Sequence, residues 1–123
     1  MNAKTQALRA YSAASSPTRT GKRIEYEVIA RITARLRNAA NLGPSGFPAL
    51  AEAVHENRRL WAAFAVDIAL PSNPLPKELR ARLFYLAEFT QQHSSKVLGR
   101  EDTIEPLLDI NTAIMRGLHN GAN

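Results

Sequence analysis

The sequence predicts an all-α protein, with about five helices in a single compact domain and no sheet. Apolar residues recur at helical spacing along most of the chain, and no segment alternates apolar and polar residues between hairpin turns. Prolines and glycines divide this pattern into about five segments. At 123 residues the chain is long enough to bury one core. We expect residues 1–123 to form one domain, in which residues 1–20 can act as a mobile N-terminal arm.

Two helices are predicted in the first third of the chain, over residues 3–14 and 24–42. The first is short, and a helix of about twelve residues is only marginally stable unless it packs against something. The second carries apolar residues every four positions and ends where Gly43 precedes Pro44. Its predicted apolar face consists of Ile24, Val28, Ile32 and Leu36, with Ile29 beside them.

The next two helices are predicted over residues 48–70 and 76–98. Residues 71–76 between them contain three prolines, which make this short loop stiff. A short connection favours an antiparallel pair of neighbouring helices. Most of the aromatic residues lie on this pair, and we expect them to form the centre of the core. They are Trp61, Phe64, Phe84, Tyr85 and Phe89.

The last predicted helix begins after Asp102 or Thr103, either of which can cap it, and runs to about Leu118. Glu105 lies in its first turn, where the helix dipole favours a negative charge. Pro106 is tolerated because it also lies within the first turn, where a backbone N–H has no partner inside the helix.

The chain is basic, with sixteen Lys and Arg against eleven Asp and Glu, but the excess lies in one region. Residues 1–37 carry a net charge of +6, whereas residues 38–123 carry −1. Such a surface can follow the phosphates of a nucleic acid. It can equally be the solvated face of an amphipathic helix. The candidate basic patch consists of Arg19, Lys22, Arg23, Arg31 and Arg35.

The sequence contains no recognisable catalytic or metal site. The absence of cysteine excludes thiol nucleophiles, Cys-ligated zinc and iron–sulfur clusters. His55 and Glu56 resemble the start of the zinc-protease motif HExxH, but Arg59 stands where the second histidine is needed. We therefore expect no enzyme activity, no metal and no cofactor. The sequence also shows no membrane span and no signal peptide, so we expect a cytoplasmic protein.

Two asparagines lie on apolar helix faces, Asn57 four positions before Trp61 and Asn111 four positions after Leu107. A buried asparagine needs hydrogen-bond partners. These two residues therefore either join helices through a hydrogen bond or line a groove that a partner closes. Arginine and aromatic residues are typical of protein interfaces. The candidate partner-binding residues are Asn57, Arg58, Trp61, Arg82, Phe84, Tyr85, Phe89 and Asn111.

Three segments of the chain resemble a known family. They are residues 47–61 (FPALAEAVHENRRLW), 79–90 (LRARLFYLAEFT) and 109–118 (DINTAIMRGL). Together with Tyr11 and residues 25–27, they are similar to the FlaF family of flagellar biosynthesis regulators of alphaproteobacteria. The resemblance covers residues 3–118 in the same order, with differences only in the loops at residues 43–46 and 99–103.

The resemblance implies a non-enzymatic cytoplasmic protein that promotes the production and secretion of flagellin. Its partner is then flagellin, bound in a chaperone-like manner, or a regulator of the FlbT type, through which flagellin mRNA is controlled. The family provides no catalytic residues to transfer to this chain. Direct binding to nucleic acid is the less favoured route, because Tyr26 is the only aromatic residue within the basic run.

Overall fold

The structure is a computed structural model, which describes the backbone of residues 19–121 and the side chains of residues 26–117. Its helices are α2 (Arg19–Asn41), the 3₁₀ turn η1 (Gly43–Gly46), α3 (Phe47–Ala69), α4 (Lys77–Leu98) and α5 (Glu105–Gly121). This part of the chain contains no strand, and the all-α prediction is confirmed. The helix expected over residues 3–14, and most of the expected N-terminal arm, lie outside the described residues.

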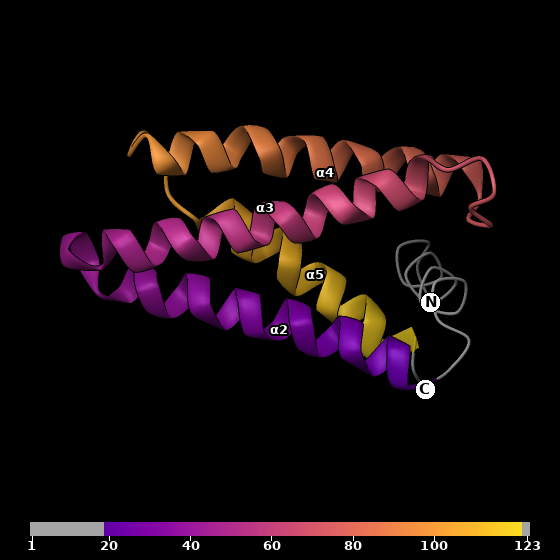
Figure 1. Ribbon diagram of the computed structural model, residues 1–123, viewed down its shortest axis with the longest axis horizontal. Helices are drawn as coiled ribbons and strands as arrows, with labels where there is room; N and C mark the ends of the chain where they lie inside the picture. The colour runs from indigo at the N-terminus through magenta and orange to yellow at the C-terminus, as the bar shows by residue number, and fades with distance from the viewer. Residues whose placement is uncertain (1–18, 122–123) are drawn as a thin grey trace.

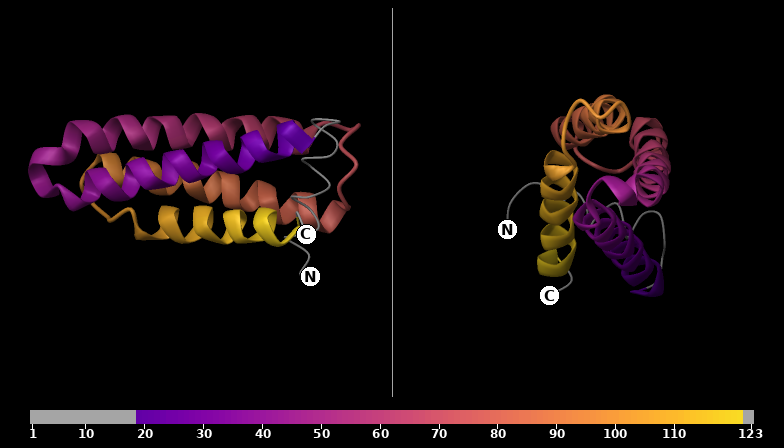
Figure 2. Two further views of the ribbon diagram at one scale, coloured as in Figure 1. Left: turned by 90° about the horizontal axis from the view of Figure 1, so that it is seen from below. Right: turned by 90° about the vertical axis from the view of Figure 1, so that its left-hand side faces the viewer.

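The four α-helices form an up-and-down bundle, in which each helix runs antiparallel to the next (Figure 1). α3 and α4 lie side by side, so the predicted antiparallel pair is confirmed. Seen along the bundle, the helices follow one another around a ring, and α5 closes it against α2 and α4 (Figure 2). α3 and α5 therefore face each other across the diagonal of the bundle.

The buried face of α2 agrees with the predicted one at Ile29, Ile32 and Leu36 and differs from it at Val28. Ile29, Ile32, Leu36 and Ala39 are buried, whereas Val28 is only half-buried. One turn of an α-helix contains about 3.6 residues. Side chains that repeat strictly every four positions therefore shift gradually around the helix and away from the core. The buried residues instead alternate steps of three and four, which keeps them on one side of the helix.

Side chains close the connection between α3 and α4. The amide of Asn73 donates to the carbonyl of Asp67 (3.1 Å), and its oxygen accepts the backbone N–H of Leu75 (3.0 Å). The guanidinium of Arg80 donates to the carbonyl of Leu70 (3.2 Å), one of the carbonyls that a helix end leaves without an internal partner. These bonds tie the end of α3 to the beginning of α4.

The turn after α4 places Arg100, and not the neighbouring Gly99, in the left-handed region (φ 59°). The N–H of Glu101 donates to the carbonyl of Lys96 (2.8 Å), as in a Schellman motif. The Arg100 guanidinium lies 4.1 Å from the ring centroid of Phe47, at the start of α3. This cation–π contact favours an arginine where glycine is the usual choice.

Two apolar clusters make up the buried core. The first lies toward the α3–α4 connection and contains Ile29, Trp61, Phe64, Ile68, Leu75, Leu79, Leu83, Ala87 and Ile114. The second lies toward η1 and the start of α5 and contains Ile32, Leu36, Ala53, Val54, Val97, Ile104, Leu107 and Leu108.

Only part of the predicted aromatic core is buried. Trp61 and Phe64 belong to the first cluster and meet edge to face, with ring centroids 5.5 Å apart. Phe84 and Tyr85 are 39% and 67% exposed, and Phe89 is half-buried. The prediction that all five rings form the centre of the core is therefore wrong. The apolar residues on the buried face of α4 are aliphatic. Phe84 and Tyr85 directly follow Leu83, and the helical spacing turns their side chains away from the core.

Buried polar side chains form a layer between the two clusters. This polar layer consists of Thr33 on α2, Asn57 on α3, Thr90, His93 and Ser94 on α4, and Asn111 on α5. In α3, α4 and α5 it lies where residues of one cluster give way to residues of the other, and on α2 Thr33 directly follows Ile32, the first residue of the second cluster. The core is therefore apolar at both ends and polar at one level in the middle.

Hydrogen bonds join three helices within the polar layer. The indole N–H of Trp61 donates to Oδ1 of Asn111 (3.0 Å). Nδ2 of Asn111 donates to Oδ1 of Asn57 (2.8 Å) and to Oγ1 of Thr33 (3.2 Å). Of the two arrangements that the sequence left open for Asn57 and Asn111, the structure shows the inter-helix hydrogen bond.

We predict that Asn111→Leu lowers the free energy of unfolding by about 2–4 kcal/mol. Leucine has a similar size, but it leaves the N–H of Trp61 and the amide of Asn57 without their partner inside the core. Denaturant unfolding followed by circular dichroism measures the loss. Asn38→Ala, at an exposed position of α2, is the control and should change stability by less than about 0.5 kcal/mol. Equal effects of the two substitutions would contradict the role of the polar layer.

Gly46→Ala should also destabilise the fold, by about 1–3 kcal/mol. A Cβ at this position would lie 2.5 Å from the Cβ of Leu42 and 2.7 Å from the backbone oxygen of Ala39. Neither atom can move without opening the turn, so we expect a lower Tm in thermal unfolding. Ser45→Ala, at the neighbouring position, removes only an exposed hydrogen bond to the carbonyl of Leu42 (3.2 Å) and should lower Tm much less. An unchanged Tm for Gly46→Ala would show that the turn has room for a methyl group.

Candidate partner-binding surface

The eight residues that the sequence offers for partner binding do not form one surface. Asn57, Trp61 and Asn111 are completely or almost completely buried, and their polar atoms bond to one another. They pack the core, and the described conformation has no groove lined by the two asparagines. The exposed residues of the set, Arg82, Phe84 and Tyr85, remain as candidates for contact with a partner.

Arg58 is engaged within the chain. Its guanidinium donates to the backbone carbonyl of Gln91 (2.8 Å) and to the hydroxyl of Ser95 (2.5 Å). In return, the side-chain amide of Gln91 donates to the carbonyl of Arg58 (3.0 Å). This reciprocal pair joins the middle of α3 to α4, so Arg58 is better explained as a connection between the two helices than as a contact for a partner.

Four of the five large apolar side chains that are exposed in the described part of the chain lie on α3, on its C-cap residue or on α4. These exposed hairpin residues are Val66, Leu70, Phe84 and Tyr85. Because Arg80 bonds to the carbonyl of Leu70, the beginning of α4 lies beside the end of α3. All four therefore lie in the half of the hairpin nearest its loop, where Arg82 is exposed too. The fifth residue, Leu42, lies at the opposite end of the bundle.

Val66 and Leu70 were missed by reasoning from the sequence. The signal was present, because residues 60–66 form an apolar run without a charged side chain. Seven consecutive residues cover every side of a helix, so some of them must face outward unless the helix is buried all round.

Phe89 packs against the neighbouring turn of its own helix. Its ring stacks on that of His93, with centroids 5.5 Å apart and planes inclined by 10°. Nε2 of His93 lies 2.7 Å from the carbonyl of Thr103, to which it donates. Phe89 and His93 thus connect α4 with the segment that leads into α5. Because the ring of Phe89 is only half-buried, it can still contact a partner at the edge of a binding surface.

The described residues contain no group of three or more His, Cys, Asp or Glu side chains that could hold a metal ion. Nor does any helix among them have the length and apolar character needed to cross a membrane.

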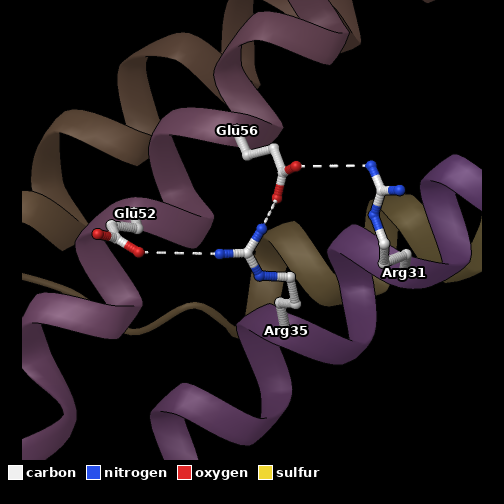
Figure 3. Close-up of polar contacts among 4 residues, drawn as sticks. All are labelled: Arg31, Arg35, Glu52 and Glu56. Carbon is white, nitrogen blue, oxygen red and sulfur yellow. Dashed lines mark hydrogen bonds and ion pairs between the residues drawn. The ribbon is translucent and has the colours of Figure 1, made fainter.

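The described part of the basic patch is paired with carboxylates of α3 (Figure 3). Arg31 lies 3.6 Å from Glu56, and Arg35 contacts Glu56 and lies 3.9 Å from Glu52. Exposed pairs of this kind contribute at most about 1 kcal/mol to stability. They still lower the positive potential that a phosphate would meet at Arg31 and Arg35. The other three residues of the basic patch, Arg19, Lys22 and Arg23, lie outside the range whose side chains the structure describes.

We predict that Glu52→Gln with Glu56→Gln strengthens binding to a generic polyanion, because it releases the two arginines. On a heparin column the double variant should elute at higher salt than the unchanged protein. Glu78→Gln with Glu88→Gln, at exposed positions of α4, raises the net charge by the same amount and serves as the control. If both double variants shift equally, the α3 carboxylates do not mask the patch.

Comparison with known proteins identifies the family of the chain. No curated protein and no solved structure matches it significantly. The family model described as flagellar protein FlaF matches residues 7–118, which include all of α2, α3 and α4 and most of α5. The resemblance seen in the sequence is thereby confirmed, and the chain belongs to the FlaF family of flagellar proteins.

Proposed function

We propose that the protein is a non-enzymatic regulator of flagellum biogenesis that promotes the synthesis and secretion of flagellin by binding flagellin in the cytoplasm as a chaperone. Membership of the FlaF family supports a flagellar role. The observation that carries the binding mode is the concentration of exposed apolar side chains near the loop of the α3–α4 hairpin.

Free flagellin has terminal segments that are amphipathic and prone to assembly. A segment of this kind buries its apolar face when it forms a helix against an apolar surface. On this protein Phe84 and Tyr85 would supply the aromatic part of that surface, and Val66 and Leu70 the aliphatic part. Because the segment must become ordered when it binds, its affinity is limited, and this favours release for export.

The second candidate function is post-transcriptional control of flagellin, by contact with its mRNA or through a regulator of the FlbT type. The observation that favours it is the net charge of +6 within residues 1–37. The pairing of Arg31 and Arg35 with carboxylates weighs against a direct phosphate contact by these two residues.

Phe84→Ala with Tyr85→Ala should weaken binding to full-length flagellin at least about tenfold, because aromatic residues dominate the energy of many protein interfaces. Isothermal titration calorimetry measures the affinity, and circular dichroism verifies the fold. Flagellin that lacks its terminal segments should bind weakly to the unchanged protein. The matched control is Leu42→Ala, which removes an exposed apolar side chain at the far end of the bundle and should leave the affinity unchanged.

The two functions make different predictions. The chaperone function requires a complex with purified flagellin alone, and no complex at micromolar concentration would exclude it. Regulation through mRNA requires an affinity for the flagellin leader RNA that falls steeply with salt, or co-purification with the FlbT-type regulator in place of flagellin.

A further inference from the structure

Two polar atoms of the polar layer have no hydrogen-bond partner among the described residues. They are Nδ2 of Asn57 and Oγ1 of Thr90, and both are buried from solvent. Buried amides and hydroxyls in folded proteins are almost always hydrogen-bonded, to protein or to ordered water. In this structure the protein supplies no such partner to either atom.

Rotating the amide of Asn57 does not satisfy it. The indole N–H of Trp61 can only donate, so it requires the oxygen of Asn111 on its side. The Nδ2 of Asn111 then faces Asn57, which must present its oxygen. The orientation of both amides follows from the tryptophan, and Nδ2 of Asn57 is left as a free donor.

Thr90 differs from the other buried hydroxyls of the polar layer. Thr33 donates to the carbonyl of Ile29 (2.7 Å) and Ser94 to the carbonyl of Thr90 (2.6 Å), each four residues earlier on its own helix. The hydroxyl of Thr90 makes no such bond. It is the second free group of the layer, and it lies on the one helix that the asparagine network does not reach.

The two free groups lie at the same level of the bundle. Arg58 and Gln91 bond reciprocally between α3 and α4, so these positions face each other. Asn57 and Thr90 each precede them by one position, and both side chains are buried. The donor on α3 and the hydroxyl on α4 therefore approach the same part of the core.

We propose that the polar layer is a binding site for one ordered water molecule, which bridges Nδ2 of Asn57 and Oγ1 of Thr90. The ligand must accept a hydrogen bond from the amide of Asn57, and it must donate a hydrogen bond to the hydroxyl of Thr90 or accept one from it. A water molecule can do both. An ion fits less well, because the layer offers no carboxylate to a cation and no basic group to an anion; Nε2 of His93 already donates to Thr103. With this water the layer connects all four helices.

A crystal structure of the full chain at high resolution tests the site directly. The expected result is a water peak within about 2.7–3.2 Å of both atoms. Direct donation from Nδ2 of Asn57 to Oγ1 of Thr90, with no density between them, would overturn the proposal.

Oxygen-17 relaxation dispersion provides a test in solution, because it counts water molecules that stay inside the protein. Thr90→Val keeps the shape of the side chain but removes the hydroxyl, and the count should fall by one. Ser94→Ala is the control, because the hydroxyl of Ser94 is already bonded within its own helix, and the count should stay the same. An equal count for the unchanged protein and Thr90→Val would contradict the bridge. If Thr90→Val does not fold, the crystal structure of the unchanged protein decides.

Discussion

The hydrogen bond from the indole of Trp61 to Asn111 determines how the side chains of α2, α3 and α5 are arranged in the polar layer. Because the indole N–H can only donate, it orients Asn111, which in turn orients Asn57 and reaches Thr33. Three helices are connected in this way at one level of the bundle, including α3 and α5 across its diagonal. If any of these helices slipped by one turn, buried amides would lose their partners. Apolar side chains tolerate such a shift more easily, so we infer that the polar layer sets the register of the bundle.

The polar layer also limits where a partner can bind. It occupies the inner faces of the helices, so a partner meets the outer surface, where the exposed hairpin residues lie. The hairpin that carries them is held by the reciprocal bonds of Arg58 and Gln91 and by the bond of Arg80 to the end of α3. A surface held in this way loses little conformational freedom on binding, which favours affinity for a flexible partner. These features agree with the binding role that we propose for a member of the FlaF family.

The net charge of the chain does not by itself give the charge that a partner meets at its surface. The excess of basic residues suggests nucleic acid, but α3 supplies carboxylates beside Arg31 and Arg35, and the pairs are visible only in the folded protein (Figure 3). Arg35 and Glu56 are 21 positions apart in the sequence, and they meet because α2 and α3 pack antiparallel. The charge that a partner encounters thus depends on the packing of the helices as well as on the composition of the chain.

By itself, the sequence determined α3 and α4 with both their ends, whereas it placed the start of α2 at residue 24, five residues after Arg19, where the helix begins. The predicted limits of α3 and α4 agree with the structure to within one residue, because prolines, glycines and helical spacing act locally. The sequence also identified the family and the antiparallel hairpin, since a short stiff loop leaves few alternatives. The sequence also placed Trp61 and Phe64 in the core, but only the tertiary structure decided that Phe84 and Tyr85 lie outside it. Packing likewise decided which residues bond to Asn57, Asn111 and Arg35. These contacts join residues that are far apart in the chain, and the spacing of residues along one helix does not show which residues of another helix lie beside it.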